Sequence, residues 1–172
     1  LFSLMQQDVF LFDEDLNFNI SLGNKDLDDN DVIDAAKYVY AHNFIVGLPS
    51  QYKFKLKNSG GNLSAGQAQL ISFARAIAQG GHVLMLDEAT SSIDSLTEEI
   101  IQKAIGNLLK NKTVIAIAHR LSTIKNSDQI LVIKRGQIVG RGSHEDLLVN
   151  QGPYASLLQE GTVLANDARK ET

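Results

Sequence analysis

Hydrophobic and polar positions follow two different periods along this chain of 172 residues. The runs Val83–Leu86 and Thr113–Ala118 are continuously apolar, which is typical of strands buried on both faces of a parallel sheet. Apolar residues recur three and four positions apart over 64–79 and 96–110, which predicts two helices, the first with Ser64 as its N-cap. This strand–helix–strand order predicts an α/β fold with a mostly parallel sheet and crossover helices.

The first eighty residues contain little strand pattern. Leu1–Phe12 is apolar apart from a polar break at Gln6–Asp8, which indicates a strand end followed by a loop. The residues that follow predict a helical turn at Leu16–Ile20, a helix at Asp31–Asn43 with Asp31 as N-cap, and an extended piece at Gln51–Leu56.

After the second apolar run, Ile130–Ile133 and Gln137–Val139 read as a hairpin, and two short helices follow at Ser143–Val149 and Tyr154–Leu158. We therefore predict four parts: a strand end and loop (1–12), a helical subdomain (13–80), the sheet core (81–161) and a flexible tail (162–172).

Composition narrows the class of protein. The hydrophobic fraction of 44% is sufficient for a globular core, and the net charge of −4 gives no basic field for nucleic acid. There is no cysteine, which excludes disulfides and thiolate metal sites. No apolar run approaches the ~20 residues that a membrane-spanning helix needs, so we expect this segment itself to be soluble.

Candidate chemistry begins where the first apolar run ends, at Asp87 and Glu88. In open α/β sheets, ligands bind beyond the carboxyl ends of the strands. One carboxylate there can hold Mg²⁺ and the other can polarise a water, with Asp94 following in a polar turn. The same pattern also fits a buried strand whose acids only favour a helix N-terminus, and this motif alone leaves both interpretations open.

Three further positions are ambiguous when taken singly. Ser64 and Gly66 open a helix after a glycine-rich loop and fit a phosphate site, but also a plain N-cap. His119 follows a strand and could contact a phosphate, although a lone histidine in a loop is more often structural. Gln7 could ligate Mg²⁺ through its amide oxygen or simply occupy a turn.

The order of these motifs is more informative than any one of them. Along the chain come Gln7-Asp8, then LSAGQ at 63–67, LMLDE at 84–88, SSID at 91–94 and AHR at 118–120. This set resembles the nucleotide-binding domain of ATP-binding cassette (ABC) transporters, over about residues 3–161, and is most similar to the exporter branch. The resemblance implies the fold of a P-loop NTPase of the ABC type, with ATP and Mg²⁺ as cofactors.

The resemblance also implies roles for individual residues. Glu88 matches the general base, Asp87 the Mg²⁺ carboxylate, Gln7 the sensor of metal and γ-phosphate, and His119 the γ-phosphate contact. The signature motif falls on Leu63, Ser64, Ala65, Gly66 and Gln67. Of these, Ser64, Gly66 and Gln67 would contact ATP bound by a second nucleotide-binding domain. Asp94 would couple the two sites of that head-to-tail dimer.

Two departures from the family pattern stand out. Ala65 replaces the usual glycine, which is tolerable if its φ stays negative. No G-x-x-x-x-G-K-[ST] motif occurs, so the sequence matches a C-terminal portion that lacks the P-loop. We therefore expect the isolated chain to be inactive, and we expect exposed strand edges that favour dimerisation or strand exchange near 113–118.

The function implied is ATP hydrolysis that powers export, with a transmembrane domain as partner at the cytoplasmic face of the membrane and no role for nucleic acid. One alternative is a non-catalytic partner or regulatory module. The other is a non-transport ABC-type ATPase, although Gln7 and Ser64 are too close in sequence for the long coiled coil of that class.

Overall fold

The computed structural model describes residues 2–5, 9–87, 95–117, 125–150 and 152–158. Contacts divide the chain into two compact units, Leu1–Ala118 and His119–Thr172. The finer division predicted from composition stays a prediction.

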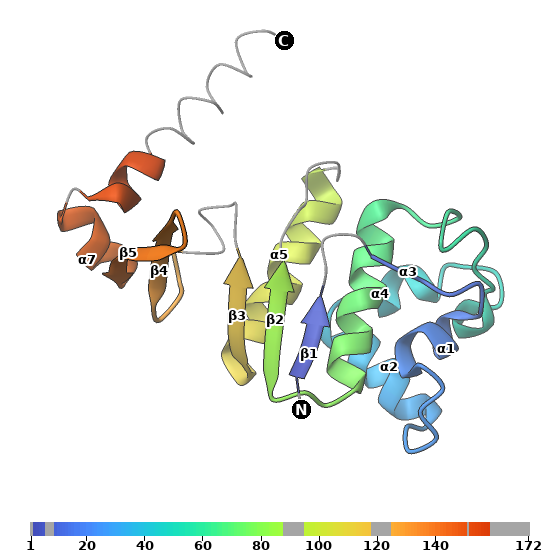
Figure 1. Cartoon of the computed structure of the whole chain (residues 1–172). Helices are drawn as coiled ribbons and strands as arrows, with labels where there is room; N and C mark the ends of the chain where they lie inside the picture. The colour runs from blue at the N-terminus through green and yellow to red at the C-terminus, as the bar shows by residue number, and fades with distance from the viewer. Residues whose placement is uncertain (1, 6–8, 88–94, 118–124, 151, 159–172) are drawn as a thin grey trace, which may run out of the picture. The chain divides into compact units, whose positions relative to one another are not determined.

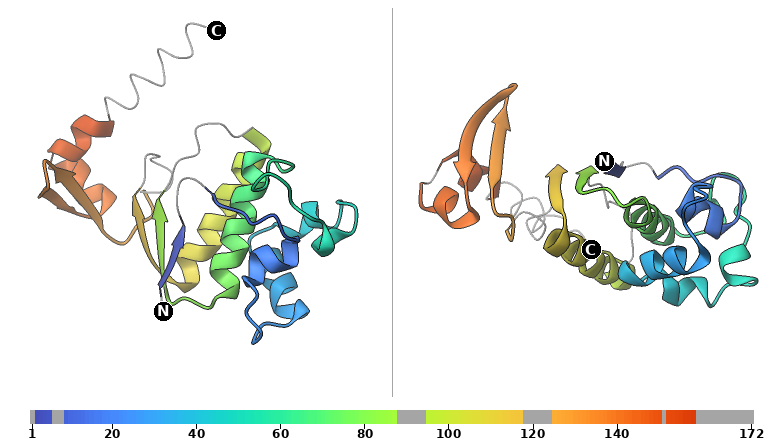
Figure 2. Two further views of the ribbon diagram at one scale, coloured as in Figure 1. Left: turned by 45° about the vertical axis from the view of Figure 1, so that its right-hand side comes forward. Right: turned by 90° about the horizontal axis from the view of Figure 1, so that it is seen from below.

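The first unit is built on three parallel strands, β1 (Phe2–Met5), β2 (Val83–Asp87) and β3 (Thr113–Ile117), in the order β1-β2-β3 (Figure 1). Two long helices, α4 (Ala65–Ala78) and α5 (Ser95–Asn111), lie together on one side of these strands (Figure 2). The α/β fold predicted from the two apolar runs is confirmed. The helices supply the crossovers that parallel strands require.

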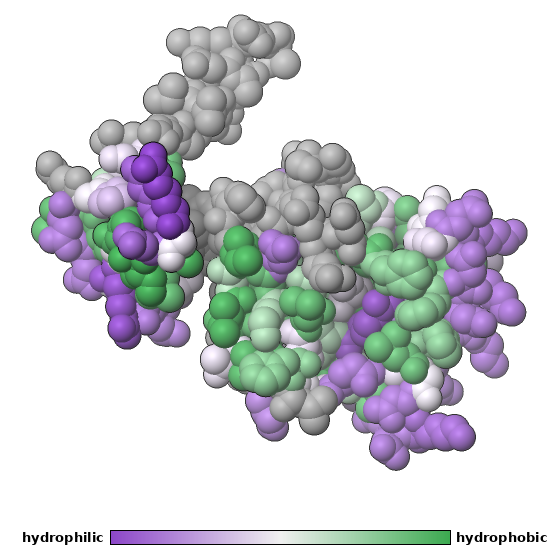
Figure 3. All heavy atoms as spheres, in the orientation of Figure 1, coloured by the Kyte–Doolittle hydropathy of each residue, from purple (hydrophilic) through white to green (hydrophobic). Residues whose placement is uncertain are grey.

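The two faces of the sheet differ in burial. Leu84 and Leu86 of β2 point into the core that α4 and α5 cover. On the opposite face, Phe2 (69%), Leu4 (61%), Ile115 (57%) and Ile117 (61%) remain largely exposed. Figure 3 shows this as apolar side chains gathered over the three strands. The described part of the chain leaves that face uncovered.

Short helices complete the first unit: α1 (Leu16–Ser21), α2 (Asp29–Tyr38), α3 (His42–Ile45) and the 3₁₀ turn η1 (Gln51–Lys53). Helices α1 and α2 both pack against α4. Fully buried side chains from these helices, α4 and the connecting segments form the centre of this region: Leu16, Ile20, Val32, Ala36, Val39, Ile45, Leu56 and Ile71.

Three sequence predictions are wrong in detail here. The helix expected over Asp31–Asn43 is two helices, because Tyr40 adopts a φ of 63° and turns the chain between α2 and α3. The N-cap is Asp28, not Asp31, because Asp28 accepts from the N–H groups of Asn30 and Asp31. The extended piece expected at Gln51–Leu56 is mostly the turn η1, with one bridge between Lys55 and Asp15.

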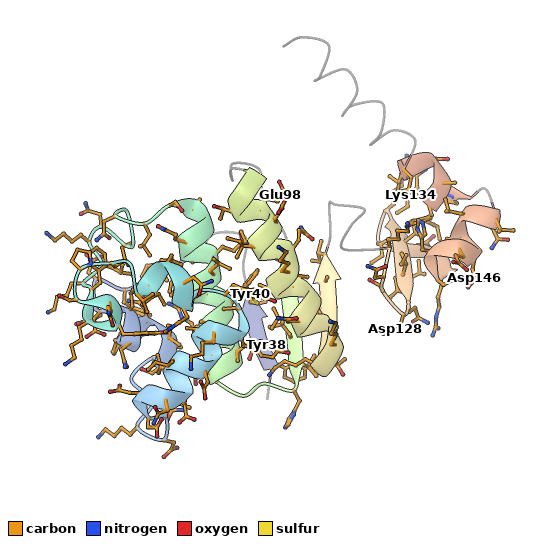
Figure 4. The ribbon with its side chains drawn as sticks, turned by 180° about the vertical axis from the view of Figure 1, so that it is seen from behind. Tyr38, Tyr40, Glu98, Asp128, Lys134 and Asp146 are labelled. Atoms are coloured by element: carbon orange, nitrogen blue, oxygen red, sulfur yellow. The ribbon has the colours of Figure 1, made fainter. Side chains whose placement is uncertain are left out.

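Helix α2 is also tied to α5 by a reciprocal pair of bonds. Tyr38 Oη donates to the carbonyl of Asn107 at 2.8 Å, and Asn107 Nδ2 donates to the carbonyl of Tyr38 at 3.2 Å. Asn107 Nδ2 also bonds to Tyr40 Oη at 3.2 Å, and Figure 4 shows both tyrosines beside α5. These bonds fix the small helices to the same scaffold as the sheet.

The second unit contains the predicted hairpin, β4 (Ile130–Lys134) and β5 (Gln137–Gly142), paired antiparallel. Arg135 and Gly136 both have positive φ (51° and 75°), as the tightest hairpin turns require. Helix α7 (His144–Val149), capped by Ser143, and a helical stretch at 153–158 pack beside it. A small core of four side chains results: Ile130, Val132, Leu147 and Tyr154.

Candidate functional site

The carboxyl ends of the three parallel strands lie at one edge of the sheet. Met5 pairs in register with Leu86, and Asp87 pairs with Ile117. Asp87 is the last residue of β2 and its side chain is exposed at this edge. The structure therefore places one predicted Mg²⁺ carboxylate where ligands of α/β sheets bind.

Four of the predicted site residues, Gln7, Glu88, Asp94 and His119, lie outside the described residues. In sequence, Glu88 immediately follows the end of β2. Gln7 follows the end of β1 by two positions, and His119 follows the end of β3 by two. Their predicted roles stay predictions.

The predicted signature residues lie at the start of α4. Ser64 is the N-cap with extended φ and ψ, Ala65 begins the helix with a negative φ, and Gly66 is buried. Ala65 therefore meets the condition under which alanine is tolerable at this position, because its backbone is not left-handed. Leu63 is half-buried and packs against the core.

Helix α4 begins at the same end of the sheet as the strand carboxyl ends. A short connection, Gln79–His82, joins the C-terminus of α4 to the start of β2, and the helix and the strand run in opposite directions. The N-terminus of α4 therefore lies at the same end as Asp87 (Figure 1). The N–H groups of Ala65 and Gly66 have no carbonyl partner within the helix, as at every helix N-terminus. This end of α4 therefore suits an anion such as a phosphate group.

Ser64 and Gln67 form a capping box. Ser64 Oγ accepts from the N–H of Gln67 at 3.2 Å, and Gln67 Oε1 accepts from the N–H of Ser64 at 3.0 Å. Both bonds use acceptor oxygens, so the Ser64 hydroxyl proton and the Gln67 Nε2 hydrogens are not spent on the cap. The pair can cap the helix and still donate to a phosphate.

Residues that the sequence did not single out hold the C-terminal part of α4. Asn19 of α1 is fully buried, and its side chain bonds to backbone groups of Phe12, Glu14 and Asp15. Arg75 of α4 reaches the same residue, and burial lowers the pKa of its guanidinium. No local sequence pattern signals a bond between residues this far apart along the chain.

A cluster of aromatic rings was also missed. The rings of Phe10 and Phe12 meet edge to face at 5.1 Å between centroids, and those of Phe12 and Phe18 at 5.8 Å. All three rings are exposed by 36–59%, and we call them the phenylalanine cluster. Single exposed apolar residues are ordinary, but a contiguous aromatic group indicates a surface for a partner.

Two features are absent from the described residues. None of their helices is both long and apolar enough to cross a membrane. They also contain no group of three or more acidic or histidine side chains that could hold a metal ion. Asp87 is thus the single predicted metal ligand that the described part of the chain contains.

Comparison with known proteins decides the family. The ABC transporter family model matches residues 2–91, which include the described β1, α4 and β2. The chain belongs to the ABC transporter family.

Individual relatives agree with this membership. The chain is 46% identical over 158 residues to an ATP-dependent lipid A-core flippase of Acinetobacter baylyi, covering 91% of this chain and 28% of that protein. It is 44% identical over 157 residues to a putative ABC transporter ATP-binding protein of Mycoplasma genitalium, covering 91% of this chain and 27% of that protein. The chain thus spans about a quarter of the length of these ABC transporter relatives.

The fold is similar to that of a solved ABC exporter as well. The structure of a bacterial Atm1-family ABC exporter with ATP bound matches 92% of this chain and 28% of that one, with a TM-score of 0.82 and 36% identity. The resemblance inferred from the motif order is therefore confirmed, and so is the ABC-type α/β fold.

Proposed function

We propose that this chain is part of the ATP-binding and ATP-hydrolysing domain of an ABC exporter. The observation that carries the proposal is the shared edge formed by Asp87, the ends of β1 and β3, and the N-terminus of α4. An exposed carboxylate and a helix N-terminus occur at the same end of one unit, as a site for Mg²⁺ and a phosphate group would require. The relatives include a flippase and an exporter solved with ATP bound, which supports the same function.

The residues fit ATP and Mg²⁺ by the chemistry of their donors. The exposed carboxylate of Asp87 is a hard oxygen ligand of the kind Mg²⁺ prefers, and Gln7 would add an amide oxygen. Bound Mg²⁺ would neutralise charge on the phosphates. Glu88 would accept a proton from the attacking water, and His119 would hydrogen-bond the γ-phosphate.

The signature residues would act on a second nucleotide-binding domain. Ser64, Gly66 and Gln67 would donate to the γ-phosphate of ATP held by that domain, using the hydrogens that the capping box leaves available. Leu63 and Ala65 would shape the turn around them, and Asp94 would connect the two sites. This arrangement makes the head-to-tail dimer a requirement for hydrolysis.

The phenylalanine cluster is the surface we propose for the transmembrane domain. Its residues follow Gln7 closely in the chain, and Phe18 belongs to α1. Figure 3 shows exposed apolar side chains over this part of the first unit. Aromatic side chains are enriched at the centres of protein interfaces. The domain would thus work at the cytoplasmic face of the membrane.

The test of catalysis uses the longer protein that contains this chain together with the sequence encoded upstream of Leu1. Glu88→Gln should lower the rate of Mg²⁺-dependent ATP hydrolysis by a factor of about 100 or more, with ATP binding retained. Glu99→Gln, an exposed change on α5, is the matched control and should leave the rate unchanged. Full activity in the Glu88 variant would reject the proposed function.

The isolated chain provides a second test. Without a P-loop in its 172 residues, it should neither bind ATP tightly nor hydrolyse it. A rate of ATP hydrolysis equal to that of the longer protein would contradict the prediction that the isolated chain lacks an essential part of the ATP site.

The docking surface has its own test. Phe10→Ser in the longer protein should weaken association between the two domains and reduce transport-linked ATP hydrolysis. Val149→Ser, which alters an even more exposed apolar residue (81%) of α7, should change neither. Equal effects of both variants would exclude the phenylalanine cluster as the docking surface.

A further inference from the structure

Arg75 makes three hydrogen bonds across the first unit. Its Nε donates to the carbonyl of Asn19 at 2.7 Å, and its Nη1 donates to the carbonyl of Phe10 at 3.0 Å. Its Nη2 donates to Oδ1 of Asn19 at 3.2 Å. One side chain of α4 therefore holds both α1 and the segment that leads into it.

Asn19 extends this hold along the segment. Its Oδ1 accepts from the N–H of Phe12 at 2.8 Å, and its Nδ2 donates to the carbonyls of Phe12 and Asp15, each at 3.0 Å. The side chain is fully buried, so these bonds are shielded from water and their loss would leave polar groups unpaired. Arg75 and Asn19 together form what we call the clasp.

The clasp joins three features that the proposed function uses. The segment from Phe10 to Phe12 carries two rings of the phenylalanine cluster and begins shortly after Gln7. Helix α4 carries Ser64 at its other end. Because the clasp binds the backbone of that segment directly to α4, a displacement of the phenylalanine cluster must displace α4 or break these bonds.

We propose that Arg75 is a positioning residue, which fixes the segment after Gln7 to the signature helix so that docking at the phenylalanine cluster and ATP hydrolysis are linked. The inference rests on the proposed function. Arginine suits the role because its planar guanidinium presents several donors in fixed directions, whereas lysine carries a single nitrogen. Lysine at position 75 would keep the charge and could not serve all three acceptors.

The chain offers a matched control on the same helix. Gln79 Nε2 donates to the carbonyl of Ser21 at 2.8 Å, so it also ties α4 to α1. This bond ends at Ser21 and does not involve the segment from Phe10 to Phe12. A loss of general helix packing would affect both positions, whereas a loss of the proposed link would affect Arg75 alone.

The experiment measures ATP hydrolysis by the longer protein as a function of ATP concentration. Arg75→Lys should lower kcat about tenfold while KM for ATP changes less than about twofold. Gln79→Ala should change kcat by less than about twofold. Arg75→Met should lower kcat as much as Arg75→Lys does. If Arg75→Met does not fold, the kcat of Arg75→Lys alone tests the inference.

A double-mutant cycle separates linkage from simple destabilisation. Phe10→Ser should lower kcat in the Gln79→Ala background as much as in the wild type, and should have no added effect in the Arg75→Lys background. Additive effects of Phe10→Ser and Arg75→Lys would overturn the inference. Wild-type kcat in Arg75→Lys, or equal losses in the Arg75 and Gln79 variants, would also overturn it.

The outcome distinguishes this inference from the proposed function. A wild-type protein that does not hydrolyse ATP would reject the proposed function. A wild-type protein that hydrolyses ATP while Arg75→Lys retains its kcat would reject the role of Arg75 alone.

Discussion

Ser64 and Gln67 bond to each other at the start of α4 through two hydrogen bonds of 3.2 and 3.0 Å. Each side chain satisfies a backbone N–H of the other residue. Two of the residues proposed to contact ATP are thus also the residues that cap the helix. Stability and phosphate binding therefore depend on the same two side chains, and a substitution at either position affects both.

A pair of substitutions at Ser64 separates these two effects. Ser64→Ala removes the cap and should lower the free energy of unfolding by about 1 kcal/mol. Ser64→Asp keeps a good capping acceptor, so stability should be retained, but it places a negative charge where a phosphate would bind. Denaturant-induced unfolding and ATP hydrolysis by the longer protein measure the two effects.

The informative result is the aspartate variant. We expect stability close to that of the wild type together with a large loss of hydrolysis. Normal hydrolysis by Ser64→Asp would show that this helix end does not face a phosphate.

The predictable part of this structure is the part governed by local patterns. The S-x-x-Q spacing of Ser64 and Gln67 is a capping-box signature, and the structure has the bonds it implies. The positive φ values at Arg135 and Gly136 likewise follow from a tight turn between two short strands. In each case the residues that decide the conformation are neighbours in the sequence.

The errors arose where several local solutions compete. Asp28, Asp29 and Asp31 are all acceptable N-caps. The bonds that select Asp28 include one that its own N–H donates to Oδ2 of Asp31. The contact between Arg75 and Asn19 has no local cause, because it depends on how α1 packs on α4. The residue types alone do not specify such a contact.

The close approach of β1 to the loop before β2 gives a second prediction. A Cβ atom on Gly81 would meet Ser3 Oγ and stand 3.1 Å from the Ser3 nitrogen. Ser3 Oγ is buried and donates to the carbonyl of Ala76 at 3.2 Å. Gly81→Ala should therefore destabilise the fold by about 1–3 kcal/mol, measured by denaturant-induced unfolding.

Gly106 is the matched control. It lies inside α5 with open space around its would-be Cβ. Gly106→Ala should stabilise the fold by about 0.5–1 kcal/mol, because alanine favours a helix interior. Two alanine substitutions of opposite sign would support the packing described, whereas destabilisation by both would point to a general intolerance of added side chains.

The exposed face of the sheet gives a third prediction. Ile115 and Ile117 lie two positions apart on β3, so they share one face, and each is more than half exposed. We expect the 172-residue chain to self-associate through this face and its strand edge. Sedimentation velocity should show oligomers for the wild type and a shift toward monomer for Ile115→Lys.

Val149→Lys controls for the added charge. Among the described residues, Val149 is the most exposed large apolar one (81%), but it lies on α7, in the other unit. This variant should remain as associated as the wild type. A wild-type chain that sediments as a monomer would refute the prediction.

The cap of α2 gives a prediction about pH. Hydrogen bonds from the N–H groups of Asp31 and Asn30 hold the pKa of Asp28 below its usual value of 3.8. Since the folded-state pKa is lower than the unfolded one, the stabilising contribution is complete above pH 3.8 and is lost as the pH falls through the folded-state pKa. Asparagine caps equally well without ionising, so Asp28→Asn should be less sensitive to acid.

The measurement is the difference in free energy of unfolding between the wild type and Asp28→Asn from neutral to acidic pH. The difference should be constant above the unfolded-state pKa, and on acidification it should shift in favour of the variant. Asp26→Asn removes the same charge from the loop just before α2, outside its cap. If Asp26→Asn changed acid sensitivity as much as Asp28→Asn, loss of net negative charge would explain the effect and the cap would not.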